Sequence, residues 1–219
     1  MPSAGEQGQR TGATAGGHLA ILELSSMCYQ FFYGAGGDHE SALRGLCETL
    51  WNLRNEPVAY LAAAVDRPGP TFRSALLPSY KANRPPKPQP MVDFLKASRM
   101  AVEAFGIPLV DWEGHEADDA IASATAAATT AGVTVSIMSI DKDFWQLVRP
   151  GVTCLSRMRG VTTRYDEAAV LAKAGVRPQQ IPDLLAIAGD ASDNIPGVDG
   201  IGAARAAQLL SALGSVEAI

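Results

Sequence analysis

Three acids crowd one short stretch of the sequence, Gly114-His115-Glu116-Ala117-Asp118-Asp119. An apolar run at residues 107–110 precedes it and predicts a buried strand, and an Ala-rich run at residues 117–131 predicts a helix. The acids therefore fall in the first turn of a helix, just beyond a strand. Acids there complement the helix dipole and cap free N–H groups, but one or two would satisfy that need. Three within four residues repel one another unless a cation lies between them, so capping and cation binding both stay open here.

The alternation of strand and helix extends outward from this stretch. Further strands are predicted at residues 18–24, 58–65 and 133–139, with two short edge strands at 152–155 and 161–164. Further helices are predicted at residues 38–53, 90–105 and 167–173, capped at their ends by Asp38, Gly106 and Asp166. Residues 67–88 are basic and Pro-rich, which predicts an exposed loop or short helices. We expect an α/β fold with a mainly parallel central sheet covered by helices.

Acids follow every main strand of this predicted sheet. Glu23, Asp66 and Asp141 lie at the ends of the first, second and fourth strands, and the cluster at 116–119 follows the third. In an open α/β sheet these ends meet at one edge, where ligands bind. Capping does not account for a strand-end acid such as Asp66. A set of carboxylate oxygens suits Mg²⁺, or Mn²⁺ in its place, and the number of acids suggests two ions.

The composition predicts a cytoplasmic protein. Of 219 residues, 47% are hydrophobic and 19% charged, and no apolar stretch approaches the length of a membrane span. Residues 1–17 lack the apolar core of a signal peptide and predict a disordered lead. The three cysteines form no C-x-x-C pair, which favours reduced thiols.

A glycine-rich stretch joins an apolar segment at residues 181–188 to a predicted helix at 203–213: Gly197-Val198-Asp199-Gly200-Ile201-Gly202. Glycines allow a tight turn whose backbone N–H groups can face a phosphate. A plain connection between two helices explains the pattern equally well, because a lone glycine repeat is a weak signal.

Several motifs match one family in order and spacing: Phe72-Arg73, Tyr80-Lys81-Ala82-Asn83-Arg84, Glu116-Ala117-Asp118-Asp119, Asp141-Lys142-Asp143, Gly189-Asp190, Asp193-Asn194-Ile195-Pro196-Gly197 and Gly200-Ile201-Gly202. From about Leu19 to its end, the chain resembles the 5′-nuclease family, which includes bacterial 5′–3′ exonucleases, the N-terminal nuclease domain of bacterial DNA polymerase I, and flap endonucleases. The resemblance implies a PIN/resolvase-like nuclease domain at residues 18–175 and a helix–hairpin–helix DNA-binding region at 176–219.

The resemblance also implies a two-metal phosphodiesterase. One ion would be held by Asp66, Glu116, Asp118 and Asp141, beside the strand-end Glu23. The second would be surrounded by Asp119, Asp143, Asp190 and Asp193. Lys81 and Arg84 match the basic pair that contacts the scissile phosphate, and Arg73 and Tyr80 fall in DNA-binding motifs. Gly197, Gly200 and Gly202 match the hairpin that grips a duplex backbone, often with a bound K⁺.

The net charge of −5 agrees with DNA binding once the proposed site is set apart. Nine of the 23 acids belong to that site, so 14 acids face 18 Lys and Arg, which leaves 18 − 14 = +4 on the rest of the chain. A mildly basic body can contact DNA.

Two departures from the family fall in one motif. Glu23-Leu24 stands where the family has Asp-Gly, and Gln30 stands where it usually has Arg or Lys. We expect Glu23 to misplace its ion, and the Leu24 side chain to obstruct the substrate where Gly would not. The chain also stops at Ile219, soon after the hairpin's second helix, so we expect the region at 176–219 to be truncated.

Three functions compete at this point. The first is a divalent-metal-dependent 5′–3′ exonuclease or flap endonuclease, a monomer acting on DNA at 5′ flaps, nicks or free 5′ ends. The second is a catalytically weakened module that still binds branched DNA, which Glu23 and Gln30 favour. The third is an RNase of the related PIN-type fold, against which the hairpin and the Tyr80–Arg84 motif argue.

Overall fold

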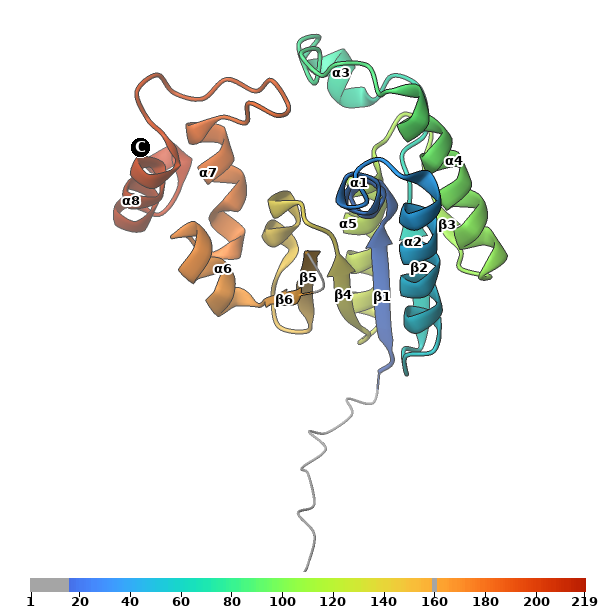
Figure 1. The fold of residues 1–219 in the computed structure, drawn as a ribbon. Helices are drawn as coiled ribbons and strands as arrows, with labels where there is room; N and C mark the ends of the chain where they lie inside the picture. Colours follow the sequence, from blue (N-terminus) through green and yellow to red (C-terminus); the bar gives the residue numbers. More distant parts are fainter. Residues whose placement is uncertain (1–15, 159–160) are drawn as a thin grey trace, which may run out of the picture.

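A computed structural model of the chain describes residues 16–158 and 161–219, so nearly all of the predicted disordered lead lies outside the described part. The central sheet has the strand order β3-β2-β1-β4-β5-β6. Its strands are β1 (His18–Glu23), β2 (Tyr60–Ala64), β3 (Leu109–Val110), β4 (Thr134–Met138), β5 (Val152–Met158) and β6 (Val161–Tyr165). All neighbouring pairs are parallel except β5 and β6. The predicted mainly parallel α/β sheet is confirmed (Figure 1).

Helices cover both faces of this sheet. They are α1 (Leu24–Gly34), α2 (His39–Arg54), α3 (Phe72–Leu76), α4 (Gln89–Ala104), α5 (Ala117–Thr130), α6 (Glu167–Ala174), α7 (Ile181–Ala188) and α8 (Ala203–Leu213), with 3-10 turns η1 (Lys142–Leu147), η2 (Pro178–Gln180) and η3 (Val216–Ala218). Side chains alternate along β1: Leu22 enters a core under α1, α2 and α4, and Ile21 enters a second core under α5. Figure 1 shows α6, α7 and α8 beside the β6 edge.

The predicted helix ends are confirmed where capping residues mark them. The Asp38 side chain accepts a hydrogen bond from Ser41 N at 3.0 Å, and Asp166 accepts one from Ala169 N at 2.9 Å. Gly106, with φ 66°, follows the end of α4. In each case a short polar side chain or a glycine supplies what the helix end lacks.

Helix α1 was not predicted. Strand β1 passes directly into it, and its N-cap residue, Glu23, makes no side-chain capping bond. The usual Ser, Thr, Asp or Asn signal for a helix start is therefore missing. Leu24, Cys28 and Phe32 on one face of α1 are buried in the core beneath it, so tertiary packing stabilises this helix.

Candidate active site

A cavity of about 450 Å³ opens at the carboxyl ends of the parallel strands. Five of the nine predicted acids line it: Glu23, Asp66, Glu116, Asp118 and Asp141. Four basic residues line the same cavity: Lys81, Arg84, Lys87 and Lys142. The sheet topology thus brings together acids that are more than a hundred residues apart in the chain.

A second cavity, of about 510 Å³, lies beside the first and shares Asp118 with it. Asp119, Asp143 and Asp193 line it, together with Arg73 and Tyr80. Asp190, the ninth predicted acid, lines neither cavity. Its Oδ1 accepts hydrogen bonds from the Ser192 backbone N and hydroxyl at 2.8 and 2.6 Å, so it shapes the turn that carries Asp193.

The carboxylates disturb one another's ionisation. Burial, followed by the charges of Glu23 and Asp141, raises the pKa of Asp118 to about 8. Burial and the charges of Asp141 and Asp190 raise the pKa of Asp143 to about 6. Burial also raises the pKa of Glu23. A bound cation would offset both the burial and the repulsion.

Asp143 gives the strongest sign that a cation fits here. Its Oδ1 is buried and has no hydrogen-bond partner among the residues that the structure describes, which is costly for a carboxylate oxygen. Three further carboxylates, Asp141, Asp190 and Asp193, lie near enough to act on its charge, and carboxylates are the ligand type that hard divalent cations prefer. In the described part of the chain, however, no three His, Cys, Asp or Glu side chains already form a set that could hold an ion.

Two basic side chains and a tyrosine hydroxyl bond with the carboxylates of Glu116 and Asp119. Lys81 Nζ donates to both Glu116 oxygens at 2.9 Å, and the Tyr80 hydroxyl donates to one of them at 2.8 Å. Arg73 donates two hydrogen bonds, at 2.6 and 2.8 Å, to Asp119. These basic groups occupy positions where a divalent ion or a phosphate would compete with them.

Capping explains more of the acids than the sequence suggested. Asp66 Oδ1 accepts a hydrogen bond from Ala117 N at 2.8 Å, and its Oδ2 accepts one from Ser25 Oγ at 3.1 Å. The prediction that capping does not account for Asp66 is therefore wrong. Asp66 follows β2, but the helix that it caps is α5, which begins after β3. Asp119 Oδ2 likewise accepts from Glu116 N at 3.0 Å. Both oxygens of Asp66 have partners, whereas Asp118 and Asp143 have no such role.

A polar junction, residues 79–84 with residues 191–194, fixes the two predicted phosphate contacts. Lys81 N donates to Asp193 O at 2.9 Å, and Arg84 Nε donates to Ser192 O at 3.1 Å. The Asn194 side chain donates back to Ser79 O at 2.7 Å. Figure 1 shows the segment after α3 and the loop after α7 on the same side of the sheet.

This junction holds strained backbone. Among residues 16–158 and 161–219, Lys81 (φ 55°) and Asn194 (φ 58°) are the non-glycine residues with positive φ. Such conformations persist where surrounding contacts enforce them, and they gather at functional sites. The contact between Asn194 and Ser79 was not predictable, because the two residues are 115 positions apart in the chain.

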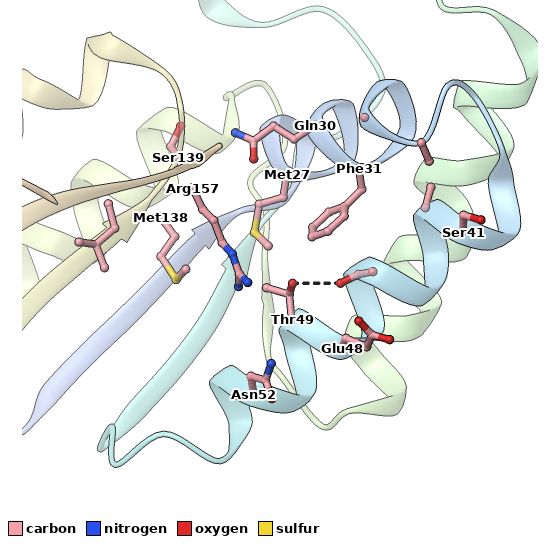
Figure 2. A pocket seen from close by; sticks show the side chains of 15 residues that line it. Met27, Gln30, Phe31, Ser41, Glu48, Thr49, Asn52, Met138, Ser139 and Arg157 are labelled. Carbon is pink, nitrogen blue, oxygen red and sulfur yellow. Dashed lines mark hydrogen bonds between the residues drawn. The ribbon is translucent and has the colours of Figure 1, made fainter. Parts of the chain in front are cut away.

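The departures from the family lie differently than expected. Leu24 is 2% exposed and belongs to the core under α1, so the prediction that it obstructs the substrate is wrong. Gln30 lines a neighbouring cavity of about 570 Å³ between α1, α2 and the β4–β5 part of the sheet (Figure 2). The Glu23 carboxylate accepts a hydrogen bond from the Ser139 hydroxyl, which itself accepts one from Asp141 N at 2.8 Å. Ser139 was not among the predicted site residues, although it lies two positions before the Asp141-Lys142-Asp143 motif.

The glycines of the hairpin serve different purposes. A Cβ on Gly197 would lie 2.4 Å from the carbonyl carbon of Ala188, so this glycine permits close backbone packing. Gly200 has φ 76°, which favours glycine in a turn, and Gly202 has open space around it. Their predicted contact with DNA stays a prediction.

We expect Gly197→Ala to lower the free energy of unfolding by about 1–3 kcal/mol, because backbone must move to admit the methyl group. Gly34→Ala is the matched control, since a Cβ there meets nothing within 4 Å. Urea denaturation of both variants measures the difference. Equal stability of the two variants would show that the turn at 189–197 relaxes freely.

Comparison with known proteins agrees with this geometry. Residues 18–175 match the family described as 5′-3′ exonuclease, N-terminal resolvase-like domain, and residues 176–219 match 5′-3′ exonuclease, C-terminal SAM fold. The chain is 36% identical to a DNA polymerase I of Rhizobium leguminosarum, covering 93% of this chain and 21% of that protein. It is 36% identical to a 5′-3′ exonuclease of Aquifex aeolicus, covering 92% of this chain and 71% of that protein.

Solved structures show the same fold. The structure of T5 5′-exonuclease with bound zinc ions superposes with a TM-score of 0.81 at 23% identity, covering 91% of this chain and 77% of that one. A T5 D15 flap endonuclease in complex with DNA and metal ions gives a TM-score of 0.74 at 22% identity, covering 91% and 76%. The chain spans about a fifth of the DNA polymerase I from Rhizobium leguminosarum.

Proposed function

Because the chain belongs to the 5′–3′ exonuclease family, we propose that it is a divalent-metal-dependent 5′ nuclease that hydrolyses DNA phosphodiesters at 5′ flaps, nicks or free 5′ ends. One observation carries this proposal: five carboxylates and the side chains of Lys81 and Arg84 line one cavity at the sheet edge. A protein that only binds DNA gains nothing from so many carboxylates that repel one another and the phosphates.

Two groups of acids would hold the ions. The first is Glu23, Asp66, Glu116, Asp118 and Asp141, which line one cavity. The second is Asp119, Asp143 and Asp193, which line the adjoining cavity, together with Asp190 in the turn before Asp193. When bound, Mg²⁺ or Mn²⁺ supplies an activated water and offsets charge on the phosphate. The unpartnered Asp143 oxygen and the raised pKa of Asp118 support this assignment.

The basic residues of the cavity would position the substrate. Lys81 and Arg84 now donate to Glu116 and Asp193. A phosphate that enters the cavity would take over part of these donors, since charge-assisted hydrogen bonds to phosphate resemble those to carboxylate. Arg73 and Tyr80 line the adjoining cavity and would contact DNA further along.

The C-terminal region would grip the duplex. The hairpin at residues 197–202 precedes α8, so its backbone N–H groups can meet a phosphate at a helix start. K⁺ at the same hairpin is part of this proposal. Contacts of this kind bind the duplex backbone without reading its sequence.

We further propose that the protein acts as a monomer in the cytoplasm. Cys28, Cys47 and Cys154 are free thiols, as expected in a reducing compartment. In the part of the chain that the structure describes, none of the helices combines the length and the apolarity needed to cross a bilayer.

Cleavage of a 5′-labelled flap should require Mg²⁺ or Mn²⁺ and stop in EDTA, while Ca²⁺ supports binding without turnover. Mg²⁺ demands a strict octahedral geometry that the larger Ca²⁺ does not reproduce. Gel-based cleavage, run beside fluorescence anisotropy in each metal, measures both quantities. Full cleavage in EDTA would refute the metal-dependent function.

The second candidate function is a branched-DNA-binding module with weakened cleavage, and one contact favours it. One oxygen of the Glu23 carboxylate accepts a hydrogen bond from Ser139, which restricts where this carboxylate can meet an ion. An extra methylene moves this carboxylate by about one bond length relative to Asp, and reacting groups tolerate less error than that. On this reading the site binds DNA well and turns over slowly.

Glu23→Asp should raise the single-turnover rate about tenfold if it recovers about 1.4 kcal/mol of activation free energy. Glu40→Asp, the same shortening at an exposed position on α2, is the matched control. Rapid-quench cleavage of the flap substrate measures the rate. A slower Glu23→Asp variant would show that Ser139 and its neighbours have adapted to glutamate, and would remove the argument for weakened cleavage.

A further inference from the structure

Three aromatic rings form an exposed cluster at the rim of the site: Phe72, Trp112 and His115. The ring centroids of Phe72 and His115 lie 5.4 Å apart, and those of Trp112 and His115 lie 5.6 Å apart. Phe72 is 42% exposed and Trp112 is 52% exposed. Large aromatic rings usually bury themselves, so an exposed group of three indicates a surface that contacts something else.

Local bonds hold this cluster in place. Phe72 N donates to Gly114 O at 2.9 Å, which ties the start of α3 to the loop that carries the other two rings. The His115 ring bonds through Nδ1 to Glu113 O at 3.0 Å. The Arg73 guanidinium lies 4.6 Å from the centre of the Phe72 ring while it binds Asp119. The surface is therefore preformed, and it would lose little freedom when a partner binds.

The cluster adjoins the proposed catalytic acids. His115 directly precedes Glu116, and Arg73 links Phe72 to Asp119. The neighbouring acid Glu113 has Arg67 Nη1 at 3.9 Å, which balances part of its charge. A DNA strand that leaves the cavity on the α3 side would thus meet aromatic faces and a guanidinium.

We propose that Phe72, Trp112 and His115 stack the unpaired bases of a 5′ single strand beside the cleavage site. This inference rests on the proposed function and adds the surface that would recognise the flap itself. Every base has a π-face, so stacking on aromatic rings is tolerant of sequence, as a structure-specific nuclease requires. The Arg73 guanidinium, which lies over the Phe72 ring, would add attraction for the same bases.

The test compares two DNA substrates that differ only in the flap. One duplex carries a short unpaired 5′ flap and the other has a nick at the same position, and both are bound in Ca²⁺ to prevent cleavage. Trp112→Ala should lower the ratio of flap affinity to nick affinity about tenfold, the effect of losing one base–aromatic stack. Trp112→Phe should restore most of the ratio, because a benzene ring also stacks.

Trp51→Ala is the matched control, since Trp51 is 61% exposed but lies on α2, away from the cluster. A fluorescent base analogue in the flap should be quenched by the wild-type protein and by Trp51→Ala, and less by Trp112→Ala. Equal losses on flap and nick, or an unchanged ratio, would overturn the stacking surface while leaving the nuclease proposal intact. If the wild-type protein binds neither substrate, the proposed function fails, and the stacking surface fails with it.

Discussion

Asp141→Asn is expected to remove nearly all cleavage, slowing the single-turnover rate by about two to three orders of magnitude. Asp141 lines the cavity of about 450 Å³. Burial raises the pKa of Glu23, Asp118 and Asp143, and the charge of Asp141 raises all three further. It is therefore the acid that couples the two groups of proposed ligands. Loss of its charge should weaken ion binding, whereas flap binding should stay within a few-fold or tighten, because one negative charge near the phosphate is gone.

The substitution should preserve the fold. Asp141 is the N-cap of η1, and its Oδ1 accepts from Asp143 N at 2.9 Å. Asn caps a helix about as well as Asp, and its amide oxygen can accept the same bond. Asp93→Asn on the exposed side of α4 is the control for an acid-to-amide change away from the site. Wild-type cleavage by Asp141→Asn would place the chemistry elsewhere.

Lys81→Ala is expected to raise the activation free energy of the chemical step by about 2–4 kcal/mol, with a much smaller loss of DNA affinity. The Lys81 ammonium lies 2.9 Å from both Glu116 oxygens and 3.8 Å from an Asp193 oxygen, and Lys81 lines the cavity of about 450 Å³. A cation in that position acts mainly on charge that develops on the phosphate during cleavage. Alanine carries the same Cβ as lysine at φ 55°, so the backbone strain changes little.

Single-turnover rates and affinities measured side by side separate the two effects of Lys81→Ala. Lys96→Ala, an exposed change on α4, should leave both quantities at their wild-type values. A loss of affinity as large as the loss of rate would instead assign Lys81 to general binding of the DNA backbone.

The sheet was predictable because each main strand is a short apolar run followed by an acid or a turn residue. That pattern predicts Glu23, Asp66 and Asp141 at one edge of the sheet, and in the structure all three line one cavity. Helix α1 escaped prediction because it follows β1 without a loop and lacks a capping residue. Hydrophobic pattern and end signals are what a sequence shows most clearly.

Long-range side-chain contacts were beyond the sequence. Nothing local indicates that Ser139 bonds with Glu23, or that Asp66 caps a helix 51 residues later. Leu24 was expected to obstruct the substrate because it stands where the family has Gly, but the helical turn that follows β1 directs its side chain into the core. Side-chain direction depends on the backbone after the motif, which the motif itself does not specify.

The central claim is that the strand-end acids form a divalent-metal site. Anomalous diffraction from crystals soaked in Mn²⁺ tests it most directly. We expect manganese peaks among the carboxylates of Asp118, Asp141 and Asp143, and their loss in Asp141→Asn. The opposite result would be manganese bound elsewhere, while Lys81 and Arg84 keep their bonds to Glu116 and Asp193. That result would show that the strand-end acids do not form a divalent-metal site.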